Sequence, residues 1–432
     1  MLKSNSRKVI FAIGGKKNSK LFADVVVENL SYEVVHIFDD PEDKECRLPE
    51  ILKKEIEIYL KKNHLRPVAF IAFARNTVNN SVENIALLFD DLSANAKYKN
   101  AKFIGPSFAS AEIFSNKWVA TKQLQSDGFS CLQTVKVTAN SVEEIKKKLK
   151  EKEFPLPSVL KATNLTGGTG LLLVNTPEDL ELQYRAHLRQ GITESILTEY
   201  LEGQEVSLEF LYLDNEFFVF PMSFKENTNL SLDHGDSKIK IAGYLKSIAP
   251  IYKEALKMGK KYNTKGYFAI EGIVYDCKKG KWKIMEGMTR FTGSYPMLNA
   301  TCPPFDSLRA VFEYIEDKPW NKVTVKNQVV FQLPVFKESK EEAERMVVEI
   351  NRLSWIITAR VEDLFLLPLS LDKRIRIQIT FKAEEKENFH EQLKQLSTIL
   401  DDPNVPNRIY KAINKLNKNF PDLIIKKGIF DI

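Results

Sequence analysis

The chain has 432 residues, 44% of them hydrophobic, which is enough for about two to four domains with cores of their own. Its 63 basic and 57 acidic residues leave a formal net charge of +6, too small an excess to indicate nucleic-acid binding. No run of about eighteen apolar residues could span a bilayer, the start MLKSNSRK has no apolar signal core, and the four cysteines form no CxxC pair. We therefore expect a cytoplasmic protein with free thiols and with small-molecule partners, and no nucleic-acid or membrane partner.

The first hundred residues alternate between apolar runs and amphipathic helices. Strands are predicted at 8–15, 32–38, 68–75 and 103–105, and helices at 20–30, 51–63 and 78–92. This alternation indicates a parallel sheet covered on both faces, with a domain boundary near Ser107. Gly14 and Gly15 follow the first strand, at the sheet edge where ligands tend to bind, although a tight strand-to-helix turn explains them equally well.

The next segment predicts one long helix at 109–128 that carries Lys117 and Lys122. A small αβ unit follows, with helices at 141–150 and 176–188 and an apolar strand that ends at Lys161. The loop after this strand contains Gly167, Gly168 and Gly170. Small residues after a strand let backbone N–H groups turn inward and hold phosphate oxygens, but such a loop is often only a turn.

Two later segments carry carboxylates on predicted strands. Residues 196–210 predict a strand, a short bend and a second strand, with Glu205 two residues after Gly203. Residues 266–291 predict a hairpin whose second strand ends on Glu286 and Arg290. A carboxylate at a strand end suits a magnesium ion that also holds nucleotide phosphates. Together these segments predict a nucleotide held between two sheets.

The rest of the chain predicts connecting elements and a smaller unit. Asp214 and Asn215 mark a hairpin turn within 208–220, and the polar residues 225–246 predict a long loop. A helix is expected at 305–315. The C-terminal unit is predicted to contain strands at 329–336 and 375–382 and helices at 340–353 and 386–400.

Five motifs, in this order and spacing, resemble the ATP-grasp ligases and, among them, the glycinamide ribonucleotide synthetase (phosphoribosylamine–glycine ligase) family. They are FIGPS (103–107), SNKWVATK (115–122), VLKATNLTGGTG (159–170), TEYLEGQEVS (198–207) and MEGMTRF (285–291). The resemblance implies a fold that is α/β and α+β. It comprises an N-terminal parallel-sheet pre-ATP-grasp domain over 1–106, an ATP-grasp domain over 107–320 with a small subdomain at about 128–201, and a small C-terminal αβ domain over 321–432.

The resemblance implies an ATP-dependent carboxylate–amine ligase that forms an amide through an acyl phosphate, with ATP and Mg²⁺ as cofactors, working as a monomer or homodimer. Lys117 and Lys161 would hold the α- and β-phosphates, and Glu205 would bind the ribose hydroxyls. Glu286 would carry magnesium, and Arg290 would stabilise the charge on the transferring group. Further nucleotide contacts would come from the loop residues Gly167, Gly168, Thr169 and Gly170 and from the connecting residues Glu199, Tyr200 and Leu201.

Three departures from the family pattern affect these expectations. Lys16-Lys17-Asn18 follows Gly15 where the family has Arg-Glu-His, and the polar stretch 225–246 lacks the family's Gly- and Pro-rich loop, so the substrates are expected to differ from phosphoribosylamine and glycine. Met288 occupies the position of a second metal ligand, which is an asparagine in the family. Glu271 is only a remote candidate to replace that ligand. The alternative is therefore an ATP-binding pseudoenzyme or regulatory subunit with weakened catalysis.

Of the histidines, only His234 in the polar loop is a candidate for proton transfer, and a surface role is the simpler interpretation.

Overall fold

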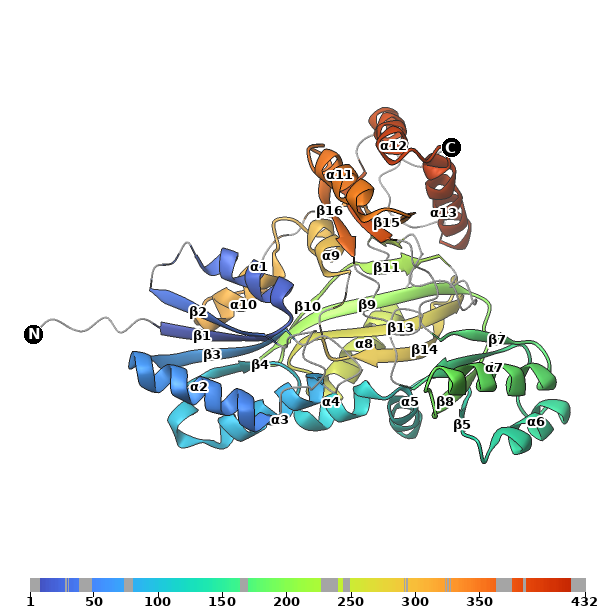
Figure 1. Ribbon diagram of the computed structural model, residues 1–432, viewed down its shortest axis with the longest axis horizontal. Helices are drawn as coiled ribbons and strands as arrows, with labels where there is room; N and C mark the ends of the chain where they lie inside the picture. The colour runs from blue at the N-terminus through green and yellow to red at the C-terminus, as the bar shows by residue number, and fades with distance from the viewer. Residues whose placement is uncertain are drawn as a thin grey trace, which may run out of the picture.

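Three sheets organise the chain (Figure 1). The structure is a computed structural model, and it describes residues 8–27, 29, 31–38, 49–73, 81–163, 170–226, 240–243, 249–290, 292, 294–322, 324, 326, 328–362, 375–383 and 386–420. Among these residues no helix combines the length and the hydrophobicity needed to cross a membrane. Cys131, Cys277 and Cys302 are free thiols, as expected, and Cys46 lies outside the described residues.

The N-terminal sheet is parallel, as the sequence predicted, and has the strand order β2-β1-β3-β4. Its elements are β1 (Lys8–Gly14), α1 (Lys16–Val26), β2 (Tyr32–Phe38), α2 (Pro49–Asn63), β3 (Arg66–Phe73), α3 (Ser81–Ala94), η1 (Ala96–Tyr98) and β4 (Lys102–Ile104). On one face, Phe70 stacks between Phe11 and Phe103 in a core closed by α2 and α3. The other face packs on α1 and on two later helices, α9 (Tyr295–Thr301) and α10 (Ser307–Ile315).

The small sheet is antiparallel and has the order β5-β8-β6-β7. Its strands are β5 (Thr134–Val137), β6 (Ser158–Ala162), β7 (Leu172–Val174) and β8 (Ser195–Glu199). Its helices α6 (Val142–Lys150) and α7 (Pro177–Arg189) pack on one face of this sheet around Leu160 and Leu197. Helix α7 begins where the sequence dictates, because Thr176 and Asp179 form a capping box and Pro177 occupies the first turn.

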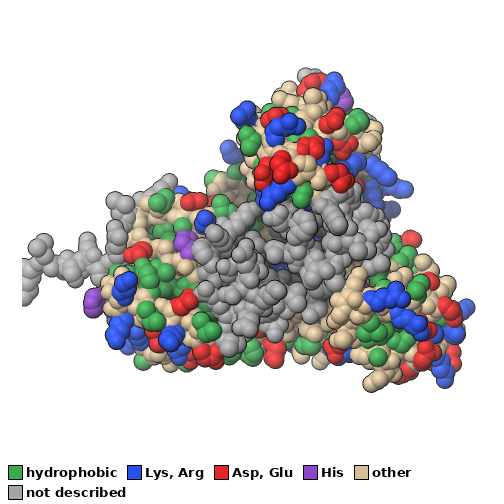
Figure 2. Space-filling model, viewed as in Figure 1, with side chains coloured by type: hydrophobic (Ala, Val, Ile, Leu, Met, Phe, Trp, Pro, Cys, Tyr) green, Lys and Arg blue, Asp and Glu red, His purple; other side chains and the backbone are tan. Residues whose placement is uncertain are grey.

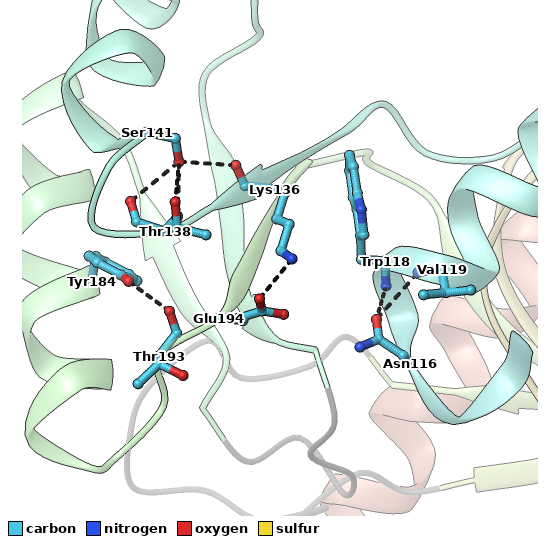
Figure 3. A network of polar contacts seen from close by, with 9 residues as sticks. All are labelled: Asn116, Trp118, Val119, Lys136, Thr138, Ser141, Tyr184, Thr193 and Glu194. Atoms are coloured by element: carbon cyan, nitrogen blue, oxygen red, sulfur yellow. Dashed lines mark hydrogen bonds and ion pairs between the residues drawn. The ribbon is translucent and has the colours of Figure 1, made fainter. Parts of the chain in front are cut away.

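Polar contacts tie the loops of the small sheet to its strands (Figure 3). Tyr184 Oη donates to the carbonyl of Thr193 at 2.8 Å, and Lys136 pairs with Glu194 at 2.8 Å. Ser141 Oγ accepts from the backbone N–H of Thr138 at 2.9 Å. These contacts join both helices of this subdomain to the strands they flank.

The large sheet has nine strands and the order β14-β13-β9-β11-β12-β15-β17-β16, with β10 paired to β9. Its strands are β9 (Gln204–Leu213), β10 (Glu216–Val219), β11 (Met222–Lys225), β12 (Lys240–Gly243), β13 (Gly266–Asp276), β14 (Lys281–Met288), β15 (Val330–Lys337), β16 (Ile356–Glu362) and β17 (Ile375–Lys382). Asp214 and Asn215 form the predicted turn between β9 and β10, with φ of 44° and 66°. All pairs in this sheet are antiparallel.

One face of the large sheet is apolar and carries the main core. Val206, Leu208 and Phe210 alternate along β9 and pack with helices on that side. The helices are α4 (Phe108–Ser115), α5 (Lys117–Ser126), α8 (Ala249–Lys261), α11 (Lys340–Ile350), α12 (Lys386–Leu400) and α13 (Val405–Asn419). The alternate side chains therefore lie on the opposite, polar face.

Two predictions about these elements were wrong in detail. The helix expected at 109–128 is two helices, because Asn116 adopts an extended conformation (φ −118°, ψ 118°) between α4 and α5. The loop expected at 225–246 contains strand β12, and β16 and α13 were not foreseen. The C-terminal strands extend the large sheet through the pairing of β12 with β15.

Candidate active site

The polar face of the large sheet places two carboxylates directly opposite each other. Glu271 in β13 pairs with Glu286 in β14, and Ser207 in β9 pairs with Glu271 on its other side. The neighbours Ile270 and Gly272 point toward the core, and a Cβ on Gly272 would lie 2.7 Å from the ring of Trp282. Glu271, judged only an outside candidate from the sequence, therefore shares a face with Glu286.

The sequence could have identified Glu271 through the alternation of side chains between the two faces of a strand. In an antiparallel hairpin, paired residues project to the same face, so the register of β13 on β14 decides which carboxylate faces Glu286. That register contains an irregularity between Glu271 and Gly272, which sequence reasoning had no means to place.

Lys117 lies beside Glu286 because the break at Asn116 makes it the first residue of α5. The Asn116 side-chain oxygen accepts hydrogen bonds from the backbone N–H groups of Trp118 (2.9 Å) and Val119 (3.3 Å), which starts the helix at this point (Figure 3). Lys117 Nζ lies 3.4 Å from Glu286 Oε2. The backbone N–H of Lys117 donates to the carbonyl of Thr163 at 2.9 Å, which joins α5 to the end of β6.

Lys122, on the same helix, lies outside this group. Its Nζ is 4.6 Å from the centre of the Trp118 ring, and the residue is exposed. Of the two helical lysines, only Lys117 reaches the carboxylates.

Lys161 is buried on strand β6. Leu160 and Leu197 point toward α6 and α7, so Lys161 and its partner Ile196 lie on the opposite face of the small sheet. Of the predicted phosphate loop, Gly167, Gly168 and Thr169 lie outside the described residues. His234 lies outside them as well.

Gly170 follows this loop and adopts a positive φ of 70°. Its carbonyl accepts a hydrogen bond from His187 Nε2 at 2.9 Å, and His187 Nδ1 lies 2.8 Å from Ser195 Oγ. Because a carbonyl can only accept, Nε2 carries the proton and Nδ1 accepts from the serine hydroxyl. Burial lowers the pKa of His187, so it stays neutral near pH 7.

The connection between the two sheets carries the residues at 199–201 that were predicted to contact the nucleotide. Residues 130–133 pair with β14 through Ile284, and the backbone of Gln133 then bonds with Glu199 at the end of β8. Glu199 Oε1 accepts from the Gln133 N–H at 2.7 Å and from Lys283 Nζ at 2.5 Å. Tyr200 N–H donates to the carbonyl of Pro157 at 3.1 Å.

Through these contacts the Glu199 side chain links the small sheet to β14, which is a structural role. The remaining main-chain groups of Glu199, Tyr200 and Leu201 lie where the chain passes from β8 to β9. Gly203 is required at this passage, because a Cβ there would lie 2.5 Å from the carbonyl oxygen of Val274.

Glu205 begins a row of charged residues across the polar face. It pairs in register with Lys225 of β11, which in turn pairs with Lys240 of β12. All three side chains are buried. Lys225 Nζ forms an ion pair with Glu271, whose side chain is 16% exposed. Sequence reasoning missed Lys225 and Lys240 because it assigned both to a loop.

Arg290 follows the last residue of β14, Met288, by two positions. Its Nη2 lies 3.6 Å from Met288 Sδ. Burial lowers the pKa of the guanidinium, whereas three surrounding carboxylates raise it. These carboxylates belong to Glu286, Glu271 and Glu209. Arg290 is therefore a cation placed among acidic groups.

The charged side chains on the polar face fit a nucleotide with a magnesium ion, because they combine carboxylate oxygens with cationic groups. Glu271 and Glu286 supply two hard oxygen ligands on adjacent strands, and Lys117 and Lys161 supply two cations. Within the described part of the chain, no three His, Cys, Asp or Glu side chains gather as a metal site. The carboxylate pair thus suits an ion that takes the rest of its ligands from phosphate oxygens and water.

Comparisons with solved structures find this architecture in several enzymes. N5-carboxyaminoimidazole synthase from Aspergillus clavatus, in complex with ADP and 5-aminoimidazole ribonucleotide, has a TM-score of 0.63 and 15% identity over 92% of this chain and 99% of its own. Biotin carboxylase from Campylobacter jejuni has a TM-score of 0.63 and 16% identity, with coverages of 93% and 96%. L-amino acid ligase from Bacillus licheniformis has a TM-score of 0.64 and 13% identity, with coverages of 91% and 98%.

No protein-family model matches the sequence, and no curated protein matches it significantly. The structural likeness extends over nearly the whole length of these enzymes, which are ATP-grasp proteins. It supports the narrower resemblance to glycinamide ribonucleotide synthetase only loosely. The chain therefore has the ATP-grasp fold, as its ordered motifs predicted.

Proposed function

We propose that the protein is an ATP-dependent carboxylate–amine ligase. The observation that carries the proposal is the pair Glu271 and Glu286, joined by Lys117 at 3.4 Å, on the polar face of the large sheet. This face is linked to the small sheet through residues 130–133 and through the contact of Lys117 with Thr163. A nucleotide between the two sheets would meet cations from one and carboxylates from the other.

In this proposal each side chain has a positioning or electrostatic role. Lys117 and Lys161 hold the phosphates, and Glu205 accepts hydrogen bonds from the ribose hydroxyls. The main chain at 199–201 meets the adenine. Arg290 stabilises the charge that develops on the phosphoryl group and on the tetrahedral intermediate.

Glu271 and Glu286 would hold the magnesium ion. A magnesium ion held there would neutralise negative charge on the phosphate oxygens. Lys225 forms an ion pair with Glu271 and holds that carboxylate on the polar face. The case for a pseudoenzyme rested on Met288, and Glu271 supplies the second oxygen ligand that Met288 lacks.

The substrates belong to the class of a carboxylate and a small amine. Among proteins of this fold, one holds 5-aminoimidazole ribonucleotide beside ADP and another is named an L-amino acid ligase, so the acid and the amine vary between members. We expect the protein to act in the cytoplasm as a monomer or homodimer. Basic and acidic side chains intermingle on the described surface in Figure 2, in keeping with small-molecule partners.

The test is ADP release from MgATP. Carboxylic acids are screened with hydroxylamine as a general acceptor, and acids that respond are then paired with a panel of amines and amino acids. ADP release that requires both an acid and an amine supports the proposal. A nucleotide-induced rise in melting temperature without turnover would favour the pseudoenzyme instead. The absence of any thermal shift at millimolar nucleotide would exclude both.

Two variants separate nucleotide binding from chemistry. Lys161→Ala should weaken ATP binding, whereas Arg290→Ala should mainly lower kcat, because the former cation meets ground-state phosphates and the latter meets developing charge. Lys117→Ala should also weaken binding. Lys122→Ala, on the same helix but stacked on Trp118, is the matched control and should leave binding unchanged.

A further inference from the structure

A second polar group lies on the same face of the large sheet, beyond the magnesium carboxylates. Glu209 is two residues along β9 from Ser207, and its residue is only 5% exposed. Strand β9 continues past it to Leu211 and Leu213, which pack with the core of the N-terminal sheet. Glu209 therefore lies between the proposed phosphate groups and the N-terminal sheet.

Glu209 is held as a hydrogen-bond acceptor. Thr292 Oγ1 lies 2.6 and 2.8 Å from its two carboxylate oxygens, and the Ser294 backbone N–H donates to Thr292 Oγ1 at 3.2 Å. Lys240 Nζ donates to Ser294 Oγ at 3.4 Å. This chain of donors directs the threonine hydroxyl to the carboxylate and orients it.

Two buried hydroxyls lie beside Glu209 with unused hydrogen-bonding capacity. Ser207 and Ser223 pair in register on β9 and β11, and they are 1% and 0% exposed. Neither hydroxyl has a hydrogen-bond partner among the described residues. Because buried polar atoms nearly always have partners, this pair points to a bound polar group that supplies them.

The residue that lies between Glu209 and Met288 in the sheet has a small side chain. Ala269 pairs with Glu209 on one side and with Met288 on the other, and Met288 Sδ touches the Arg290 guanidinium. Two strand spacings separate Glu209 from Met288, roughly 10 Å between their Cα atoms. The side chain between them in this row, that of Ala269, is a single methyl group, so no larger side chain separates the carboxylate from the guanidinium.

The charged groups that face Glu209 come from three other strands. Lys225 of β11 and Lys240 of β12 lower its pKa, Glu271 of β13 raises it, and the Thr292 hydroxyl lowers it. Burial is the largest influence and raises the pKa to about 7. A carboxyl group of this acidity exchanges protons readily at neutral pH.

We propose that Glu209 binds the amine substrate as an ammonium ion and takes its proton. This inference rests on the proposed ligase function and identifies the acceptor as a primary amine that arrives protonated. The ammonium N–H bonds are directed to the Glu209 carboxylate and to the oxygens of Ser207 and Ser223. Arg290 meets the acyl phosphate on the other side of Ala269.

The proton and electron balance is as follows. One N–H proton moves to the Glu209 carboxylate, and the nitrogen lone pair attacks the carbonyl carbon of the acyl phosphate. The new C–N bond forms, the C–O bond to phosphate breaks, and the second proton of the former ammonium leaves with the phosphate. Glu209 then releases its proton to solvent, which returns the site to its starting state.

The first test uses Glu209→Gln with an acid that supports ADP release. Hydroxylamine is neutral at pH 7 and requires no base, so hydroxamate formation should stay within about threefold of wild type. Amide formation should fall by about a hundredfold or more, the usual contribution of a general base, and should recover as the pH rises and frees the amine. Equal loss with both acceptors, or no loss with the amine, would overturn the inference. Glu216→Gln, an exposed glutamate on β10, is the matched control.

The second test does not depend on turnover. The Glu209 carboxyl carbon is observed by ¹³C NMR in protein saturated with MgADP. Its resonance is assigned as the one that disappears in the Glu209→Gln variant. Methylammonium should shift this resonance, whereas tetramethylammonium, which has the same charge and no N–H donor, should not. A resonance that ignores methylammonium overturns the inference whether or not ligase activity is found, and a response without ligase activity refutes the proposed function alone.

Discussion

The buried carboxyl group of Glu209 should make the stability of the protein fall as the pH rises through neutrality. Its pKa is about 7 in the folded protein against an ordinary value of 4.5, so the folded state holds a proton that the unfolded state has released. Below pH 4.5 both states are protonated and the group has no effect. Above pH 7 both are ionised, and the full cost of ionising the buried group is present.

The size of this effect follows from the two pKa values. The difference of 2.5 corresponds to about 3 kcal/mol at about 1.4 kcal/mol for each pKa unit. Glu209→Gln removes the titration, so its free energy of unfolding should rise relative to wild type by about this amount between pH 4.5 and pH 8. Urea denaturation at a series of pH values, followed by tryptophan fluorescence, measures the difference. Parallel pH curves for wild type and Glu209→Gln would refute the reasoning, and Glu216→Gln should follow wild type throughout.

Three further predictions concern the same sheet. Glu271→Gln removes the carboxylate that pairs with the buried Lys225 and should cost about 3 kcal/mol in urea denaturation. Adding Lys225→Met should recover much of that stability without restoring magnesium-dependent ATP binding, so recovery of both would show that Glu271 is no metal ligand. Gly203→Ala should lower the free energy of unfolding by about 1–3 kcal/mol, because its methyl group would meet the Val274 carbonyl; an unchanged urea midpoint would contradict this. Met288→Asn should lower the magnesium concentration needed for ATP binding, since an amide oxygen suits the ion better than a thioether, and an unchanged titration midpoint would show that this position does not face the metal.

Local patterns were sufficient for many of the elements. The alternation of apolar runs and amphipathic helices predicted the parallel N-terminal sheet, and Asp214-Asn215 predicted the turn between β9 and β10. Both signals depend on neighbours in the chain and on side-chain periodicity. The break at Asn116 was missed because its amide caps α5 only when the preceding helix ends, and the local composition suits one continuous helix equally well.

Strand order was the part that local patterns left open. The four residues of β12 carry too little periodicity to stand out in a polar stretch, yet their pairing with β11 and β15 joins the C-terminal strands to the large sheet. Which strands become neighbours depends on packing between segments about ninety residues apart, and no local propensity contains that information. The domain boundaries at 106/107 and 320/321 remain predictions.

By itself the sequence determined many local elements, because apolar periodicity, glycine positions and caps act over short stretches of chain. The ordered motifs implied the fold through their resemblance to the ATP-grasp ligases. The same resemblance predicted Lys117, Lys161, Glu205, Glu286 and Arg290 as residues of one nucleotide site, and this remains a prediction. Only the tertiary structure decided that Glu271 faces Glu286, that Lys225 compensates Glu271, and that Glu209 is buried beside two unpartnered serines. Register across a sheet and burial beneath distant segments set these relations, and a shift of one residue in the pairing would have reversed each of them.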